Sequence, residues 1–231
     1  MIDWSSIQAV AFDLDGTLVD SVPDLAASAN AMRTALGLPE LTRETLQSFV
    51  GDGLAVMVHR VLTNDYNGRA DETLWQRGFA EFVRHYGANL ANATRPFPET
   101  EATLQLLRKL ALPLAVITNK SERLAVNLLK ELNLDAYFSM VVGGDTLPER
   151  KPDAAPLLYV AEILGVEPKN MLMVGDSHND MLAAKAAGCP VVGVSFGYGD
   201  MTQLAKDVHT APDVVVDTLP EIFDALKQHA L

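Results

Sequence analysis

The chain has 231 residues, of which 48% are hydrophobic and 21% are charged, and its formal net charge at pH 7 is −12. A chain of this length can bury one sizeable hydrophobic core and a smaller second one. So acidic a protein is repelled by nucleic acids and by anionic membranes, and a small anionic substrate can bind only where a local cation reverses the field.

Cys189 is the only cysteine, which excludes an internal disulfide and a cluster of thiolate metal ligands. Residues 1–10 carry an acid where a signal peptide has lysine or arginine. No apolar run approaches the ~18 residues that a membrane span requires. The sequence therefore predicts a cytoplasmic protein, which we expect to be a monomer or a homodimer without nucleic-acid or membrane partners.

The first predicted element is a buried strand at 7–15 that ends in two aspartates. Apolar residues at helical spacing then predict helices at 21–37 and 72–87, and strand character is scarce before residue 100. We therefore expect a helical insertion after the first strand. Its linkers are expected near 18–21 and 92–99.

From about residue 100 onward, short apolar strands alternate with amphipathic helices. The strands are predicted at 112–118, 137–144, 171–175, 190–196 and 213–217. This alternation is typical of a parallel sheet with helices on both faces. The expected fold is α/β, with a doubly wound, Rossmann-like parallel core made of residues 1–18 and 91–231. A small helical domain of residues 19–90 is inserted after the first strand.

Four polar clusters are expected at the carboxyl ends of predicted strands, at 13–17, 118–120, 150–152 and 175–180. In doubly wound sheets, ligands bind beyond the carboxyl ends of the strands. We therefore expect these four segments to meet in one crevice.

The acids of this crevice require a cation. Bare carboxylates at Asp13, Asp15, Asp176 and Asp180 would repel one another until some were protonated. Mg²⁺ prefers oxygen ligands and commonly binds a substrate phosphate as well. The phosphate oxygens would be bound by the Lys151 ammonium, the Thr118 hydroxyl and backbone amides at Gly16 and Thr17.

The pair of aspartates at the end of the first strand then has a chemical explanation. Asp13 can attack phosphorus to form an aspartyl-phosphate. Asp15 can protonate the leaving alkoxide and later deprotonate the hydrolytic water.

Three of the clusters have a simpler interpretation when each is taken alone. The segment 13–17 could be a helix-capping turn, and 118–119 and 176–177 could cap the helices that follow. A calcium loop is a poor match, since its glycine should be the sixth residue and not the fourth. A phospho-acceptor signalling module also joins a parallel sheet to an aspartyl-phosphate, but it has no use for Asp15 or for a large insertion.

Together, the clusters resemble the motifs of the haloacid dehalogenase superfamily of phosphohydrolases. The matching segments are DLDGT, Thr118, Lys151 and GDSHND, in that order. Longer stretches resemble the bacterial phosphoglycolate phosphatase branch of that superfamily, namely AVAFDLDGTLVDS, FVGDGL, LPLAVITNKS, YFSMVVGGD, KPDAAPL and MVGDSHNDMLAAKAAGCPVVGVSFGYG.

The resemblance implies a role for each matching residue. Asp13 would be the nucleophile and Asp15 the acid/base, and Mg²⁺ would be held by Asp13, the Asp15 backbone carbonyl and Asp176. Asp180 would be a further ligand or an acid that supports the ligands. Thr118, Asn119 and Lys151 would bind phosphate.

The resemblance also implies that the helical insertion is a cap. Under this interpretation, Gly51, Asp52 and Gly53 are the segment of the cap expected to face the substrate, although the same residues also suit a plain turn between helices. His59 and His85 are expected at the surface or in packing, and Trp75 with Phe79 and Phe82 in the core of the cap.

The resemblance implies a Mg²⁺-dependent phosphatase whose small phosphorylated substrate is 2-phosphoglycolate. Two alternatives use the same core residues: a phosphatase for a sugar phosphate such as N-acetylmuramic acid 6-phosphate, and a β-phosphoglucomutase-like phosphotransferase.

Overall fold

The computed structural model describes residues 2–229, which form two compact units. One unit contains the chain up to Val19 and from Pro96 onward, and the other contains Asp20–Arg95. The bounds of this helical unit, Asp20–Arg95, differ from the 19–90 expected for the insertion. The short strands β2 (Val19–Asp20) and β3 (Arg95–Pro96) pair where the chain leaves the first unit and returns to it.

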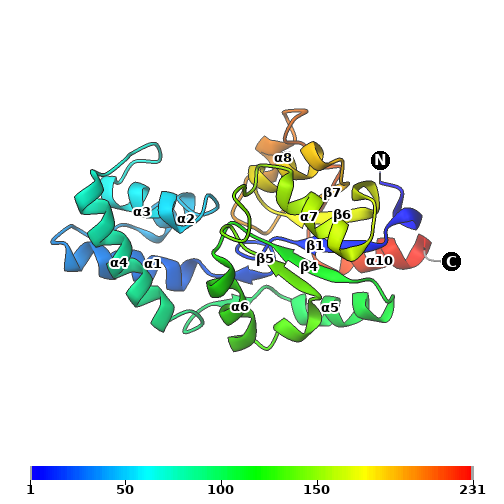
Figure 1. Ribbon diagram of the computed structural model, residues 1–231, viewed down its shortest axis with the longest axis horizontal. Helices are drawn as coiled ribbons and strands as arrows, with labels where there is room; N and C mark the ends of the chain where they lie inside the picture. Colours follow the sequence, from blue (N-terminus) through cyan, green and yellow to red (C-terminus); the bar gives the residue numbers. More distant parts are fainter. Residues whose placement is uncertain (1, 230–231) are drawn as a thin grey trace. The chain divides into compact units, whose positions relative to one another are not determined.

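In the described part of the first unit, six parallel strands form one sheet (Figure 1). Across the sheet their order is β5 (Met140–Val142), β4 (Leu114–Ile117), β1 (Ala9–Phe12), β6 (Met171–Gly175), β7 (Val191–Val194) and β8 (Val214–Val216). The chain extends the sheet from β1 first through β4 and β5, and then on the other side through β6, β7 and β8. This is a doubly wound order, so the predicted α/β fold class is confirmed.

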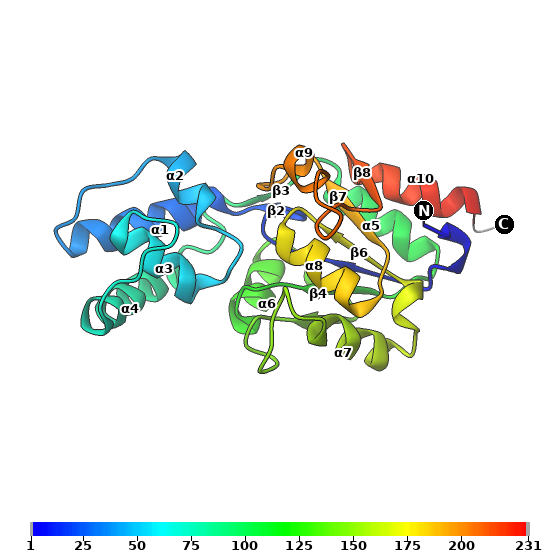
Figure 2. The same ribbon diagram turned by 90° about the horizontal axis from the view of Figure 1, so that it is seen from above.

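Helices cover both faces of this sheet (Figures 1 and 2). They are α5 (Thr100–Lys109), α6 (Glu122–Glu131), α7 (Ala155–Leu164), α8 (His178–Ala187), the short α9 (Met201–Leu204) and α10 (Pro220–His229). Single 3-10 turns are η1 (Trp4–Ser6), η2 (Asp135–Tyr137) and η3 (Pro168–Asn170).

Side-chain alternation along the strands explains why two layers of helices are needed. All four residues of β1 are buried. Ala9 and Ala11 belong to a core cluster with residues of α7 and α8. Successive side chains of a strand point to opposite faces, so Val10 and Phe12 face the layer that contains α5, α6 and α10 (Figure 1). A central strand covered on both sides in this way holds its last residue, and hence Asp13, firmly in place.

The helical unit contains α1 (Val22–Ala35), α2 (Arg43–Ser48), α3 (Leu54–Thr63) and α4 (Glu72–Ala88). Helices α1 and α4 pack against each other and bury Leu25, Met32, Phe82 and Tyr86. The expected place of Phe82 in the core of this unit agrees with its complete burial. This unit therefore has its own hydrophobic core.

A buried carboxylate ties the end of the helical unit to its first helix. Asp24, in the first turn of α1, is 4% exposed. Its Oδ2 accepts hydrogen bonds from the Thr94 amide at 2.7 Å, the Thr94 hydroxyl at 2.8 Å and the Ala93 amide at 2.9 Å. These bonds satisfy backbone donors that the fold takes out of water.

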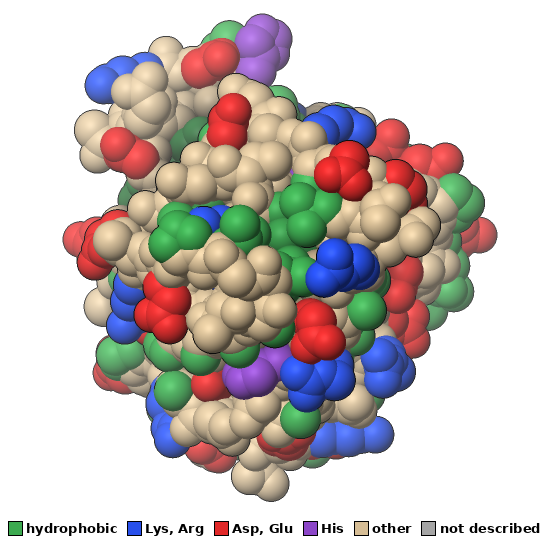
Figure 3. Space-filling view, turned by 90° about the vertical axis from the view of Figure 1, so that its left-hand side faces the viewer, with side chains coloured by type: hydrophobic (Ala, Val, Ile, Leu, Met, Phe, Trp, Pro, Cys, Tyr) green, Lys and Arg blue, Asp and Glu red, His purple; other side chains and the backbone are tan. Residues whose placement is uncertain are grey.

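No helix among residues 2–229 has both the length and the apolar character of a membrane span. Figure 3 shows acidic and basic side chains interspersed over one face of the molecule.

Candidate active site

The ends of three adjacent strands bring together the polar residues of the site. Strands β4, β1 and β6 are neighbours in that order and run parallel, and they end at Ile117, Phe12 and Gly175. Asp13, Thr118 and Asp176 are the residues that follow these ends. The three residues consequently lie at one edge of the sheet, which is where doubly wound folds bind their ligands.

Lys151 is the cation at the centre of this cluster, and its side chain is 2% exposed. Its Nζ lies 3.0 Å from Asp13 Oδ1 and 2.6 Å from Asp180 Oδ1. It also donates to the Ile117 carbonyl at 2.5 Å. Lys151 thus donates hydrogen bonds to Ile117 and Asp180, whereas its contact with Asp13 is an ion pair, because Asp13 Oδ1 has no hydrogen-bond partner among the described residues. The backbone of Lys151 is fixed in turn by Asn119, whose Nδ2 donates to the Lys151 carbonyl at 2.9 Å.

Two donors hold the Asp176 carboxylate. The Thr17 hydroxyl donates to Oδ1 at 3.1 Å, and the Tyr198 amide donates to Oδ2 at 2.7 Å. Gly16 has a φ of +93°, and a Cβ at that position would lie 2.3 Å from Asp176 Oδ2. Only glycine both adopts this conformation readily and leaves room for the carboxylate.

Asp180 is engaged through both carboxylate oxygens. Its Oδ1 pairs with Lys151, and its Oδ2 accepts from the Ser177 amide at 2.9 Å and the Ser177 hydroxyl at 2.7 Å. This is a capping box at the start of α8. Asp180 therefore anchors Lys151 to α8, and its role as a further ligand or as an acid that supports the ligands remains a prediction.

Asp15 pairs with a second buried lysine. Lys120 Nζ lies 2.9 Å from each of the two carboxylate oxygens of Asp15. The Lys120 side chain is 1% exposed, and that of Asp15 is 13% exposed. The two aspartates of DLDG are thus each matched with a different lysine.

The electrostatics of the cluster favour an added positive charge. Burial raises the pKa of Asp13 to about 7, against the opposing effect of Lys151. Burial and the neighbouring Asp13 and Asp180 raise the pKa of Asp176 to about 8. For Lys151, burial lowers the pKa, but the carboxylates of Asp13 and Asp180 outweigh it and the pKa is raised.

The geometry of these acids fits a divalent cation. Asp13, Asp176 and Asp180 are all buried and offer oxygen atoms that lie within 4.8 Å of one another. A hard cation would bind such oxygen donors and relieve the cost of ionising Asp13 and Asp176 out of water. The residues present therefore fit a divalent metal.

The structure gives Gly16 and Thr17 local contacts of their own. The Gly16 amide donates to the Val19 carbonyl at 2.9 Å, and the Thr17 amide donates to the Leu14 carbonyl at 3.4 Å. Thr17 is fully buried. In the structure these residues form the turn and hold Asp176, so their predicted binding of phosphate remains a prediction.

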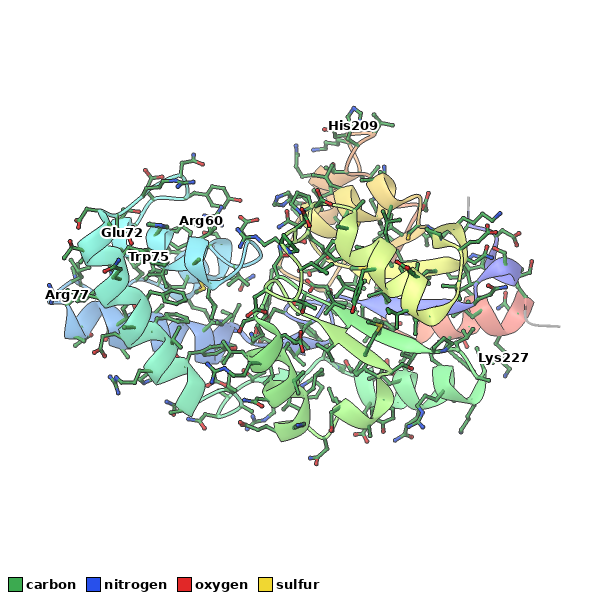
Figure 4. All side chains as sticks on the ribbon, in the orientation of Figure 1. Arg60, Glu72, Trp75, Arg77, His209 and Lys227 are labelled. Carbon is green, nitrogen blue, oxygen red and sulfur yellow. The ribbon has the colours of Figure 1, made fainter. Side chains whose placement is uncertain are left out.

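The predicted substrate segment belongs to the helical unit. There, Asp52 pairs with Arg60 at 2.6 Å. Arg60, which Figure 4 labels in the helical unit, also stacks over the Tyr66 ring, at 3.8 Å from its centroid, and donates to the Phe49 carbonyl. This anchoring gives Asp52 a role within the fold of its own unit, and the predicted contact of Gly51, Asp52 and Gly53 with substrate is still a prediction.

The aromatic residues of this unit form a stack with His59. The His59 and Trp75 rings lie 5.3 Å apart, and the Trp75 and Phe79 rings 4.9 Å apart. Trp75 Nε1 also donates to the Ala55 carbonyl, and the His85 ring is hydrogen-bonded to the Ser28 hydroxyl. These contacts agree with the packing roles expected for both histidines.

Sequence reasoning missed three contributions to the site. Lys120 lies within the TNK cluster, but the sequence predicts phosphate binding only for Thr118 and Asn119. The Tyr198 amide and Gly197 come from the loop after β7, where a Cβ on Gly197 would lie 2.2 Å from Asp176 Cβ. The two glycines of the segment FGYG signal a close backbone approach, and they could have pointed to this loop.

Comparison with known proteins agrees with this geometry. The model of the family described as haloacid dehalogenase-like hydrolase matches residues 10–194. The chain belongs to this family. The predicted resemblance to the haloacid dehalogenase superfamily is therefore confirmed, and the protein is an enzyme of the hydrolase class.

Relatives of this hydrolase match most of its length. A protein named phosphoglycolate phosphatase from Neisseria meningitidis serogroup A is 58% identical, over 96% of this chain and 94% of the relative. Another of the same name, from Chromobacterium violaceum, is 52% identical over 96% and 97%. A crystal structure described as a predicted phosphoglycolate phosphatase from Haemophilus somnus has a TM-score of 0.88 and 35% identity, over 95% of this chain and 97% of that one. The predicted likeness to bacterial phosphoglycolate phosphatases is confirmed.

Proposed function

We propose that this hydrolase is a Mg²⁺-dependent phosphatase that converts 2-phosphoglycolate to glycolate and phosphate through an aspartyl-phosphate on Asp13. The observation that carries the proposal is the buried set of Asp13, Asp176 and Asp180 around Lys151 at the carboxyl edge of the sheet. The names of the relatives in Neisseria and Chromobacterium support the choice of phosphatase and of substrate.

The residues present would bind the substrate phosphate beside Asp13. Lys151 lies 3.0 Å from Asp13 Oδ1, so a phosphate that approached this carboxylate would also meet the ammonium. Thr118 and Asn119 follow β4, the strand next to β1. In this proposal their side chains complete the phosphate site.

A bound Mg²⁺ would be held by Asp13, the Asp15 backbone carbonyl and Asp176, and would supply positive charge that offsets the phosphate oxygens. Asp180, with both oxygens engaged by Lys151 and Ser177, would keep Lys151 in place behind these ligands. Thr17 and the Tyr198 amide would hold Asp176 in the orientation that the structure gives it.

The reaction then takes two steps. A carboxylate oxygen of Asp13 attacks phosphorus, the bond from phosphorus to the ester oxygen breaks, and Asp15 gives its proton to the leaving alkoxide. In the second step a water attacks the phosphorus of the aspartyl-phosphate while Asp15 takes a proton from it. Phosphate leaves and the Asp13 carboxylate is restored.

We assign substrate selection to the helical unit as a cap, with Gly51, Asp52 and Gly53 as its candidate contacts. The resemblance of the sequence motifs to the superfamily, which implies a cap, supports this assignment, and so does the hydrophobic core that this unit has of its own. Closure of a cap over the phosphate site would exclude water until the aspartyl-phosphate has formed.

The test is phosphate release with Mg²⁺ from 2-phosphoglycolate, beside a panel of sugar phosphates and with Asp13→Asn as the blank. We expect turnover of 2-phosphoglycolate above that of the sugar phosphates, and a loss of at least about 10⁴-fold in Asp13→Asn because the nucleophile is gone. Circular dichroism would establish that this variant is folded.

Each other outcome changes a different part of the proposal. Preference for a sugar phosphate would keep the core assignments and overturn the substrate. Transfer of phosphate between hydroxyls of a sugar without net release would indicate a phosphotransferase. Retained activity of folded Asp13→Asn would overturn the nucleophile.

A further inference from the structure

Lys120 is the partner of the Asp15 side chain. Among the described residues, Lys120 is the only hydrogen-bonding or ion-pair partner that the carboxylate of Asp15 has, and it binds both oxygens at 2.9 Å. The two residues are 105 positions apart in the sequence and belong to the segments that follow β1 and β4. This contact therefore exists only because the sheet brings these two strands together.

The turn that carries Lys120 is fixed on both sides. The Lys120 amide donates to the Thr118 hydroxyl at 3.2 Å. The Lys120 carbonyl accepts from the Gly144 amide at 2.8 Å. Gly144 packs so closely that a Cβ on it would lie 2.5 Å from the Asn119 carbonyl oxygen. The backbone of Lys120 is thus set by β4 on one side and by the loop after β5 on the other.

The pairing fixes the direction of the Asp15 carboxylate. A single hydrogen bond leaves a carboxylate free to rotate about χ2, whereas contact of one ammonium with both oxygens restrains that rotation. With 13% of its side chain exposed, Asp15 otherwise borders solvent, where hydration would favour other rotamers. The Lys120 side chain is 1% exposed, and burial of an ammonium costs folding free energy unless a carboxylate such as that of Asp15 pairs with it.

We propose that Lys120 is a positioning residue that holds Asp15 in the orientation from which it exchanges a proton with the leaving group and with water. The proposal rests on the function assigned to Asp15 above. Lys120 is distinct from Lys151, which pairs with Asp13 and Asp180. One lysine accompanies the nucleophile and the other accompanies the acid/base.

The test compares two leaving groups in Lys120→Met, a variant that keeps the length of the side chain and removes its charge. The glycolate alkoxide needs a proton as it leaves, whereas p-nitrophenolate is a stabilised anion and leaves without one. For 2-phosphoglycolate we expect kcat to fall about 10- to 100-fold with KM within about twofold, a part of what general acid–base catalysis contributes. For p-nitrophenyl phosphate, the rate of the first-turnover burst should stay within about twofold.

Three further variants serve as controls. Lys130→Met removes an exposed lysine of the same unit and should leave both substrates unaffected. Lys120→Arg keeps a charge that can contact both carboxylate oxygens and should recover part of the lost kcat. Asp15→Asn should show the same dependence on the leaving group as Lys120→Met, and more strongly.

A double-mutant cycle with Asp15→Asn decides whether Lys120 acts through Asp15. If it does, Lys120→Met causes no further loss in the Asp15→Asn protein, because the group that it positions is already gone. An additional loss of the burst rate, or a rise in KM, in that background would mean direct contact with substrate or a general effect on the fold, and would overturn the proposal. Wild-type turnover of 2-phosphoglycolate by folded Lys120→Met would overturn it as well.

These outcomes separate the inference from the proposed function. If Asp15→Asn itself kept full activity towards 2-phosphoglycolate, the assignment of the acid/base would fail. If Asp15→Asn lost activity while Lys120→Met did not, only the positioning role of Lys120 would fail.

Discussion

Substitution of Gly16 by alanine tests the physical reasoning about how Asp176 is held. The added Cβ would lie 2.3 Å from Asp176 Oδ2, well inside the 3.0 Å below which real Cβ contacts essentially never fall. Asp176 has little room to retreat, because the Tyr198 amide holds Oδ2 at 2.7 Å and Gly197 packs against its Cβ. The added Cβ must therefore displace the Asp176 carboxylate from the position in which it lies within 4.8 Å of the oxygens of Asp13 and Asp180.

Substitution of Gly16 by alanine should lower both the stability of the fold and the affinity for a divalent metal. A positive φ costs a residue with a Cβ roughly 1–2 kcal/mol of stability. Displacement of Asp176 should lower divalent-metal affinity or activity by about 10- to 100-fold, as expected when a metal ligand loses its orientation. Gly188→Ala is the matched control, since Gly188 has a φ of +77° in the same unit and open space around its Cβ position.

The assay is urea unfolding and phosphate release for both variants, with Mg²⁺ titrated into each. Gly188→Ala should lose stability while keeping its turnover and its response to Mg²⁺. Gly16→Ala should lose stability, turnover and most of the response to Mg²⁺. If Gly16→Ala instead matched Gly188→Ala in turnover and metal response, the argument that the turn at Gly16 shapes the acid cluster would be refuted.

Two other predictions concern protons and buried hydrogen bonds. Because the pKa values of Asp13 and Asp176 are raised to about 7 and 8 in the folded protein, these groups favour folding at low pH and lose that contribution as pH rises through those values. Mg²⁺ and protons compete for the carboxylates of Asp13 and Asp176, so the rise in melting temperature caused by Mg²⁺ should grow between about pH 6 and pH 9. A rise that did not depend on pH would contradict the assignment of these two residues as metal ligands. Asp24→Ala leaves the buried amides and hydroxyl of residues 93–94 without their acceptor and should cost about 2–4 kcal/mol in urea unfolding, against less than about 0.5 kcal/mol for the exposed Glu40→Ala. Equal effects of these two substitutions would show that the Asp24 bonds contribute nothing.

The fold class could be predicted because its signals are local. The run MLMVG predicts a strand at 171–175, and β6 occupies Met171–Gly175. Gly165 predicts the end of a helix, and α7 ends there with Gly165 in the left-handed conformation. Helix α9 has only four residues, which is too few for a periodic pattern to indicate a helix.

Contacts between distant segments could not be predicted in the same way. DLDGT and TNK each identify a cluster, but nothing local in either shows that Lys120 pairs with Asp15 and Lys151 with Asp13. Those pairings depend on strand order and on which side chain the turn directs inward. Similarly, Asp52 stands between two glycines that indicate a turn, while its ion pair with Arg60 depends on how α3 continues.

The division of the chain into two units has a consequence for how the protein is made. The central strand β1 is synthesised before its two neighbours in the sheet, β4 and β6, which begin only at Leu114 and Met171. After β1 and before β4, the ribosome produces all of Asp20–Arg95, a unit rich in local helical contacts that form quickly. We therefore expect the helical unit to fold first during synthesis, while β1 and its aspartates wait unpaired for the strands that will enclose them.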